Sequence, residues 1–583
     1  MTDGQLTGEE TTRRRSANLD GRVALGVRLT SHVAIWISLF VPTINEALRG
    51  WRAVGDNTGI VFWSYRAISL QPRLVGQESS TTAAHNLSSL GPLQYWLLAI
   101  PVHLDPQQGA LWGAALAGAM VLSLAAEAAW SIGSWQASAV VAIAVADLAW
   151  LMPEVFSDLV WNPNFGAVFL IATVVFAWVV ATGALRWLPI LVACASVTAQ
   201  SHLIFVPTVV LMTVAALSFG VFRAGQDRQL RERRARWLLI GGVVGTVCWS
   251  FPVLQEVTGS PGNLSTLVNG GRGDAVVGTQ LSLRLLDISY SPYPIVVKHF
   301  PSEFALTALA EPARFPVSVG WAVLACVTMG ALLAAIYGNT RLAALAMVCL
   351  VYTFGMFISF SLIPRANVLN LPYVCFCWWL VGLLFWATVV AAAAEVTSVG
   401  LRSHHGAKAV VIDDGHAAHC PERRVALQDG GGRVRRAWTP VPAGCIAIAL
   451  VGIVTVLGVS NTAPASAAEA QAGGFGVPGD SSGPVTEMQI QRIAKAIERT
   501  VRRGPVAFEI HVEDPRFSRA DVLGQEGADA AGVLWQLTLD GRQSGYPPEL
   551  TIWTAEFPVA QAGWPTVVVT VRDGRVLSAV RAR

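Results

Sequence analysis

Residues 165–183 read FGAVFLIATVVFAWVVATG, a run without one charged side chain. Because a helix needs about 20 apolar residues to cross a hydrocarbon core of about 30 Å, this run predicts a transmembrane helix. Similar runs on both sides of it predict further spans. We expect about eleven in all, at 25–47, 109–129, 135–152, 165–183, 187–200, 203–222, 237–255, 317–337, 341–362, 371–395 and 441–460.

The composition of the whole chain is also that of a membrane protein. Of its 583 residues, 53% are hydrophobic and 14% are charged, against roughly 25% charged in a typical soluble domain. Mean hydropathy is +0.50. These values exclude an ordinary soluble enzyme, a disordered chain and a collagen-like fibre. The net charge of +3 comes without a basic tract of the kind that binds nucleic acid, so we expect no nucleic-acid partner.

The arginines predict the orientation of the chain in the plasma membrane, because cytoplasmic loops are enriched in Lys and Arg. The loop 223–236 carries six arginines and is placed in the cytoplasm. The other segments placed there include the N-terminal tail 1–24 and the loop 396–440. The segments placed outside are 48–108, 153–164, 256–316 and the C-terminal tail.

Segment 91–104 is apolar but short, with proline near each end. We expect an interfacial or re-entrant helix on the outer face. Counting it as a span would place the six-arginine loop outside, against the charge rule.

The predicted fold class is a predominantly α-helical polytopic membrane protein with a small C-terminal extracytoplasmic α/β domain. The expected parts are the tail 1–24, a transmembrane domain 25–460, a linker 461–484 rich in Ala, Gly, Ser and Pro, and the outer domain 485–583. Within that domain the sequence predicts a helix at 485–503, strands at 505–512 and 548–553, a helical stretch at 519–539 and a hairpin at 565–580.

The first outer loop, 48–108, is dense in polar and aromatic residues, and Asp56 follows soon after the first span. A carboxylate at the membrane–water boundary can act as a general base on a hydroxyl, bind a metal or simply be solvated. Asp158, in the second outer loop, is either a second acid that assists this base or a helix cap.

Other constellations point to no chemistry. Seven of the eight cysteines lie in apolar runs, so a disulfide framework is not expected. The His416 to Cys420 run does not have the spacing of a zinc site. The chain lacks a Walker-type glycine-rich loop, so ATP-driven transport has no support.

An ordered set of short motifs runs through nearly the whole chain. It comprises Gly55-Asp56-Asn57, PRLVGQES at 72–79, GPLQYWLLA at 91–99, Trp161-Asn162-Pro163, Gln200-Ser201-His202, Pro252 and Gln255 with Gly259 to Leu264, and Gly532 to Gly541. This set resembles the polytopic GT-C glycosyltransferases, in particular actinobacterial cell-envelope members.

The resemblance implies an integral-membrane hexosyl- or pentosyltransferase with a polyprenyl-phosphate-linked sugar donor in the lipid bilayer. It implies an extracytoplasmic envelope glycan, glycolipid or glycoprotein as acceptor, and Asp56 as the general base. Arginine or histidine would offset the charge of the leaving phosphate. The candidate substrate-binding residues are Asn57, Arg66, Arg73, His85, Tyr95, Trp96, Asp158, Trp161, Asn162, Gln200, His202 and Arg365. No cofactor is certain, and a divalent cation is left open.

The chain departs from the family pattern at one place. Related members often carry His-His-Pro-Gly-Pro where this chain has Ser88-Ser89-Leu90-Gly91-Pro92, with His85 three residues upstream. One alternative is therefore a non-catalytic homologue that binds a lipid-linked sugar or scaffolds envelope assembly. A less favoured alternative is a secondary transporter, which predicts broken helices and ionisable groups near the midplane, whereas the polar groups here gather at the outer edge.

Overall fold

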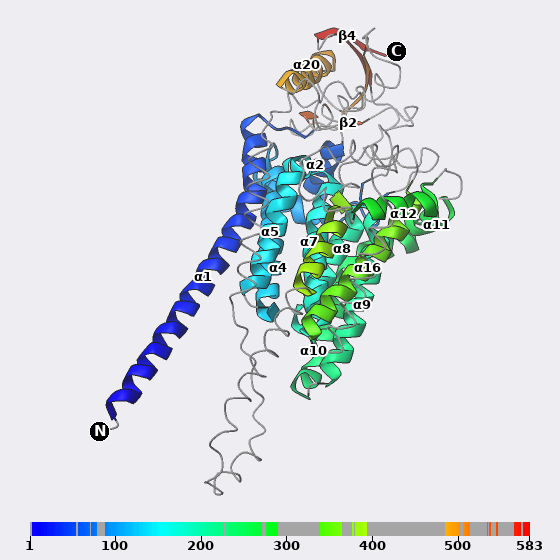
Figure 1. Ribbon diagram of the computed structural model, residues 1–583. Coiled ribbons are helices and arrows are strands. Elements are labelled where there is room, and N and C mark those ends of the chain that lie inside the picture. The colour runs from blue at the N-terminus through cyan, green and yellow to red at the C-terminus, as the bar shows by residue number, and fades with distance from the viewer. Residues whose placement is uncertain are drawn as a thin grey trace, which may run out of the picture.

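The computed structural model of the chain (Figure 1) describes residues 3–53, 56–69, 72–77, 88–133, 135–226, 228–259, 261–270, 276–289, 339–363, 376–377, 379–392, 484–501, 505–512, 533, 536–537, 544–545, 565–572 and 575–582. The described chain is mainly helical. Its helices are α1 (Asp3–Leu48), α2 (Asp56–Arg66), α3 (Leu93–Leu104), α4 (Gly109–Gly133), α5 (Trp135–Leu151), α6 (Pro153–Ser157), α7 (Asn162–Ala181), α8 (Leu188–Ser201), α9 (Val206–Gln226), α10 (Arg228–Thr258), α11 (Asn263–Gly270), α12 (Gly278–Ser289), α16 (Thr340–Leu362) and α20 (Pro484–Thr500).

Among the described residues, six helices are long and apolar enough to cross a membrane, and each coincides with a predicted span. They are Ala24–Leu48, Gly109–Gly133, Asn162–Ala181, Leu203–Gly225, Arg233–Thr258 and Thr340–Leu362. The predicted spans 135–152, 187–200 and 371–395 correspond to the shorter apolar helices α5, α8 and Trp379–Ala392. The spans predicted at 317–337 and 441–460 lie outside the described residues, as do the loop 396–440 and nearly all of the linker. The total of eleven therefore stays a prediction.

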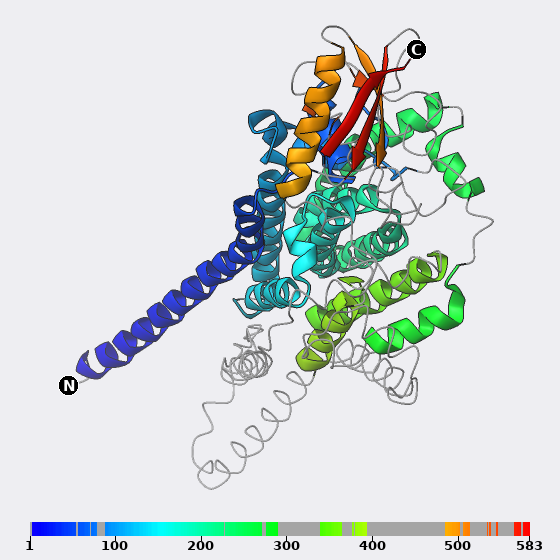
Figure 2. The same ribbon diagram turned by 90° about the horizontal axis from the view of Figure 1, so that it is seen from above.

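Helix α7 forms the centre of the bundle and packs against α4, α8, α9 and α16 (Figure 1). In its most apolar stretch 94% of the residues are buried, against 17% in the corresponding stretch of α1. Gly166 permits the close approach of α7 to the end of α8, because a Cβ there would lie 2.9 Å from the Ser201 side chain and 2.7 Å from the Phe205 ring. Helix α1 is peripheral, and its N-terminal part projects away from the other helices (Figures 1 and 2).

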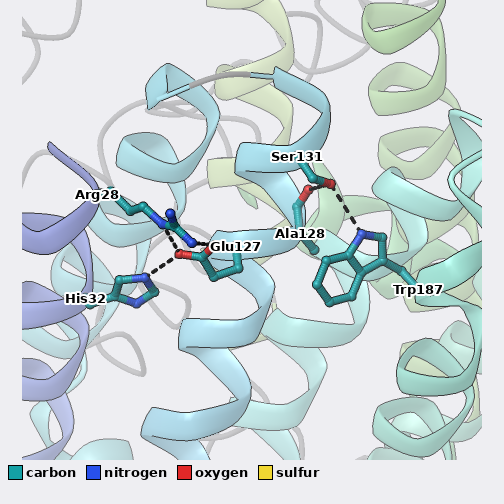
Figure 3. Close-up of polar contacts among 6 residues, drawn as sticks. All are labelled: Arg28, His32, Glu127, Ala128, Ser131 and Trp187. Carbon is teal, nitrogen blue, oxygen red and sulfur yellow. Dashed lines mark hydrogen bonds and ion pairs between the residues drawn. The ribbon is translucent and has the colours of Figure 1, made fainter. Parts of the chain in front are cut away.

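A polar cluster holds α1 against α4 (Figure 3). The Arg28 guanidinium donates to both oxygens of the Glu127 carboxylate, from Nε at 2.6 Å and from Nη2 at 2.5 Å. His32 Nε2 lies 2.7 Å from Glu127 Oε1. Further along the same helices, Trp36 Nε1 donates to Ser123 Oγ at 3.1 Å. Paired in this way, charged groups in an apolar helix avoid the cost of facing lipid alone.

In its described residues, the first outer loop contains two helices, of which only α3 was expected. Helix α2 was missed because its apolar run, Ile60 to Trp63, is too short to show a helical period. Asp56 in its first turn favours the helix by facing the positive end of the helix dipole. The segments on either side of the undescribed residues 78–87 pair through Gly76 N–H to Ser89 O at 2.9 Å and Ser89 N–H to Gln77 O at 2.7 Å.

The C-terminal unit is a sheet with one helix against it (Figure 2). Its strands are β1 (Val506–Val512), β2 (Ser544–Gly545), β3 (Thr566–Arg572) and β4 (Arg575–Arg581), in the order β2-β1-β3-β4. β1 is parallel to β2 and β3, and β3 and β4 form an antiparallel hairpin with an irregularity at Thr570/Val571. These elements match the predicted helix, first strand and hairpin. The strand at 548–553 and most of 519–539 lie outside the described residues.

Candidate active site

Two carboxylates from different outer segments are linked at one end of the bundle. Asp56 is the first residue of α2, and Asp158 directly follows the short helix α6. The indole N–H of Trp161 donates to Asp56 Oδ2 at 3.0 Å. The main-chain N–H of Trp161 also stabilises the charged form of the Asp158 carboxyl, which acts to lower the pKa of that group. One residue thus joins two acids that the sequence keeps far apart.

Shielding from water changes the acidity of both groups. Burial raises the pKa of Asp56, while hydrogen bonds from Trp161 and Gln77 act to lower it. Burial raises the pKa of Asp158 to about 6. Hydrogen bonds from Asn57 and Trp161 act to lower this pKa, and the negative charge of Asp56 acts to raise it. Both residues keep part of their surface accessible. Both carboxyl groups therefore hold a proton to higher pH than an ordinary aspartate does, which suits acid–base catalysis.

Three side-chain amides hold these acids in place. Asn57 Nδ2 donates to Asp158 Oδ1 at 2.9 Å, Gln77 Nε2 to the main-chain oxygen of Asp56 at 3.1 Å, and Asn164 Nδ2 to the main-chain oxygen of Asp158 at 3.0 Å. Carboxylate and carbonyl oxygens can only accept hydrogen bonds, so the NH2 group of each amide must be the part that faces Asp56 or Asp158. The three amide oxygens are buried and have no hydrogen-bond partner among the described residues.

The segment that carries Asp158 and Trp161 is anchored to neighbouring helix ends. Asn162 Nδ2 donates to the main-chain oxygen of Ser201 at 2.7 Å, and Ser89 Oγ donates to the same oxygen at 3.1 Å. Gln94 Nε2 donates to the main-chain oxygen of Val160 at 2.7 Å. Asn162, a predicted site residue, therefore uses its amide nitrogen to bind the end of α8. This contact supports the site without being part of it.

Ser88 and Ser89, the two serines of the run Ser88 to Pro92, are packed inside the structure. The main-chain N–H and C=O of Ser88 bond to the side chain of Asn263 at 3.2 and 3.0 Å. Ser89 is 2% exposed, and a Cβ on Gly76 would lie 2.7 Å from the Ser89 Cβ. An imidazole at position 89 would require this strand pair to move apart.

Three predicted site residues, Gln200, Tyr95 and Trp96, lie in the packed region beside this segment. Gln200 is 2% exposed; its Nε2 donates to the main-chain oxygen of Cys248 at 2.7 Å, and its oxygen lies directly against Gly91. Tyr95 is buried. Trp96 is exposed on one side and stacks on Phe251 with ring centroids 5.3 Å apart. Of the three, Trp96 is the side chain that an apolar ligand can reach.

His202 ends α8 with its imidazole turned back on the chain. Its Nδ1 accepts from the Ile204 main-chain N–H at 3.3 Å, which places the proton of the neutral ring on Nε2. Burial lowers the pKa of His202 to about 4. The ring is therefore neutral at pH 7 and can offer a ligand a hydrogen bond but no positive charge.

Two arginines of the first outer loop share one aromatic ring. The guanidinium carbon of Arg73 lies 5.1 Å from the centroid of the Trp63 ring, and that of Arg66 lies 5.9 Å from it and 5.7 Å from the Phe62 ring. A pair of guanidinium groups is suited to an anion such as a phosphate. The remaining predicted residues, His85 and Arg365, lie outside the described residues.

The divalent cation remains an expectation. In the described part of the chain, no three His, Cys, Asp or Glu side chains form a group that could hold a metal ion. Two carboxylates with amide oxygens nearby are ligands that hard cations take, usually completed by several waters.

Sequence reasoning missed Gln77 and Asn164. Gln77 lies inside the quoted 72–79 motif, and Asn164 follows Asn162 by two positions in the run Trp-Asn-Pro-Asn. Their presence in polar runs next to the candidate acids was the available signal. Their partners are main-chain oxygens, which no side-chain pattern identifies.

No family model matches the chain. No curated protein matches it either. Among solved structures, the chain is similar to the crystal structure of ArnT from Cupriavidus metallidurans bound to undecaprenyl phosphate. The match has 15% sequence identity, covers 94% of this chain and 93% of that chain, and has a TM-score of 0.44.

Proposed function

We propose that the chain is a membrane glycosyltransferase that moves a sugar from a polyprenyl-phosphate donor to an extracytoplasmic acceptor, with Asp56 as the general base. The observation that carries this proposal is the linked pair of shielded but accessible carboxyl groups, Asp56 and Asp158, at one end of a membrane bundle. A site for acid–base chemistry next to the bilayer is what a lipid-linked sugar requires.

The proposed reaction is a direct displacement at the anomeric carbon. Asp56 removes the proton of an acceptor hydroxyl as that oxygen bonds to the anomeric carbon. The bond from this carbon to the phosphate oxygen breaks, and polyprenyl phosphate leaves with the electron pair. Burial raises the pKa of Asp56, which makes Asp56 a stronger base. Repulsion between the charges of Asp56 and Asp158 acts in the same direction.

The leaving phosphate is assigned to the arginine pair on Trp63. Arg66 and Arg73 approach the same ring from the loop that carries Asp56, and two guanidinium groups can offset the charge that develops on a phosphate. The exposed apolar residues Leu97, Ile100 and Leu104 lie on one face of α3 and offer a surface for the lipid chain. Arg365 and His85 are proposed as further ligands on the sequence alone, and neutral His202 as a hydrogen-bond donor.

The sugar and the acceptor are proposed only as classes. The proposal of a pentose or hexose rests on the resemblance of the sequence motifs alone. The acceptor is an envelope glycan, glycolipid or glycoprotein, for which the C-terminal unit offers a separate binding surface.

The proposal is tested by sugar transfer from a radiolabelled polyprenyl-phosphate sugar pool in membranes that contain the wild-type chain or Asp56→Asn. The substitution keeps the size of the side chain and removes the base. We expect transfer by the wild type and a loss of at least about a hundredfold in the variant, the usual contribution of a general base. The matched control is Asp105→Asn, whose carboxylate accepts from two main-chain N–H groups after α3, away from the acid pair. Equal transfer by wild type and Asp56→Asn contradicts the role of Asp56. Repeating the assay with a chelator tests the divalent cation.

The alternative is a non-catalytic binder of lipid-linked sugar, and one observation favours it. Ser88 and Ser89 stand where the GT-C members that the chain resembles often carry two histidines. Both serines are engaged in hydrogen bonds within the protein. The alternative predicts binding of the labelled lipid-linked sugar without transfer, and equal binding by Asp56→Asn.

A further inference from the structure

Trp161 occupies an unusual place between the two acids. It is the residue before the first turn of α7, with an extended backbone at φ −58° and ψ 128°. Pro163 in that first turn fixes the start of the helix. With this backbone, the side chain reaches Asp56 while the main-chain N–H reaches Asp158.

The indole of Trp161 has one polar atom and one proton to donate. That proton is directed at Asp56 Oδ2 over 3.0 Å, across 105 positions of sequence. A neutral donor to a carboxylate forms a charge-assisted hydrogen bond, which is stronger than one between two neutral groups. The orientation of the Asp56 carboxylate therefore depends on where α7 begins.

We propose that Trp161 is a positioning residue for the acid pair, holding Asp56 through its indole N–H and Asp158 through its main-chain N–H. This inference rests on the proposed function of the same site. It assigns to Trp161 a contact with the base where the sequence suggested a contact with the substrate.

The consequence for charge follows from the groups around the pair. The charged groups that act on Asp158 are Asp56 and Glu46, both acidic. Burial raises the pKa of these carboxyl groups, and hydrogen bonds lower it. At Asp56 the hydrogen bond from Trp161 lowers the pKa the most. Removing the indole N–H leaves burial unopposed by that bond, so the pKa of Asp56 rises.

The test variant is Trp161→Phe, which keeps an aromatic ring and removes the N–H. The matched control is Trp36→Phe, which removes an indole hydrogen bond of similar length to Ser123, on the α1–α4 seam. Folding of each variant is checked by gel filtration of the full chain in detergent. The protonation of Asp56 is then followed against pH by its labelling with a carbodiimide, which reacts with protonated carboxyl groups, and read by mass spectrometry.

We expect the labelling midpoint of Asp56 to move up by about one pH unit in Trp161→Phe, the size of shift that loss of one hydrogen bond to a charged group produces. Trp36→Phe should leave it unchanged. In the transfer assay, the acidic limb of kcat/KM should move by the same amount. An unchanged midpoint in folded Trp161→Phe overturns the inference.

A second measurement leaves Trp161 intact. In the chain labelled with nitrogen-15 at its indole nitrogens, one indole N–H resonance should shift with the same midpoint as the labelling of Asp56 and lose that shift in Asp56→Asn. An indole spectrum in which no resonance follows that midpoint overturns the inference. If the labelling shift is as expected but the wild type transfers no sugar, the proposed reaction is wrong and the contact between Trp161 and Asp56 is still supported. Transfer without the labelling shift removes the role of Trp161 alone.

Discussion

At the scale of single residues, the site depends on where protons reside. Asp158, with a pKa of about 6, is charged at pH 7 and neutral at pH 5, and its charge in turn raises the pKa of Asp56. The two groups titrate as a pair, so a measured pH profile belongs to both. His202, with a pKa of about 4, stays neutral throughout this range.

We predict that kcat/KM for sugar transfer falls on acidification at a pH above the usual pKa of an aspartate, because burial raises the pKa of Asp56 and its protonation removes the base. In Asp158→Asn the neighbouring negative charge is absent, so the pKa of Asp56 falls and the acidic limb moves to lower pH, by about one unit. The measurement is the pH profile of initial rates in wild type, Asp158→Asn and the control Asp105→Asn. A limb that moves to higher pH in Asp158→Asn would contradict the coupling.

Part of this site could be predicted from the sequence. Asp56, Asn57 and Trp161 were candidates because they lie in the short motifs that carry the resemblance, and Asp158 was a candidate because it lies beside one of these motifs. Their mutual contacts were not predictable, because they depend on how α2, α6 and α7 pack. Gln77 was missed since it binds main chain and carries no motif of its own.

At the scale of elements, the junction of α3 and α4 shows how glycine places the first outer loop. Gly109 begins α4, and a Cβ there would run directly into the main-chain carbonyl of Pro101 in α3. At Gly113, one turn on, a Cβ would lie 2.7 Å from the Pro101 ring. The two glycines let α3 lie against α4. The sequence indicated both helices but not this contact, because a pattern of small residues names no partner.

We predict that Gly109→Ala lowers the thermal-denaturation midpoint of the chain in detergent, since overpacking against a rigid carbonyl costs about 1–3 kcal/mol. The control is Gly242→Ala on α10, where an added Cβ would meet nothing within 4 Å. Alanine favours a helix over glycine, so the control should be equal to or above the wild type. Equal midpoints for the two variants would contradict the close contact.

At the scale of the whole molecule, the candidate site and the C-terminal unit lie toward the same end (Figure 1). Helix α2, which carries Asp56, is at the end of the bundle nearest to α20 and β4, while the N-terminus lies at the opposite end. An odd number of spans stays a prediction from the arginine distribution, with the tail 1–24 placed in the cytoplasm.

We predict that the two ends of the chain lie on opposite sides of the membrane. A fluorescent protein fused to the N-terminus should fluoresce, as it does in the cytoplasm, and alkaline phosphatase fused to the C-terminus should be active, as it is outside. The physical reason is the six-arginine loop 223–236, which resists translocation. An inactive C-terminal phosphatase in a full-length fusion would contradict an odd number of spans.

The hydrogen bond between Trp161 and Asp56 also sets an order in time during synthesis. The two residues are 105 positions apart, and a ribosome adds roughly 5–20 residues per second. Asp56 is therefore added to the chain roughly 5–20 s before its partner Trp161. During that interval α4 and α5 are inserted, and the first outer loop remains exposed to water. The newborn Asp56 is an ordinary solvated carboxylate, and it becomes a shielded one only when the start of α7 arrives.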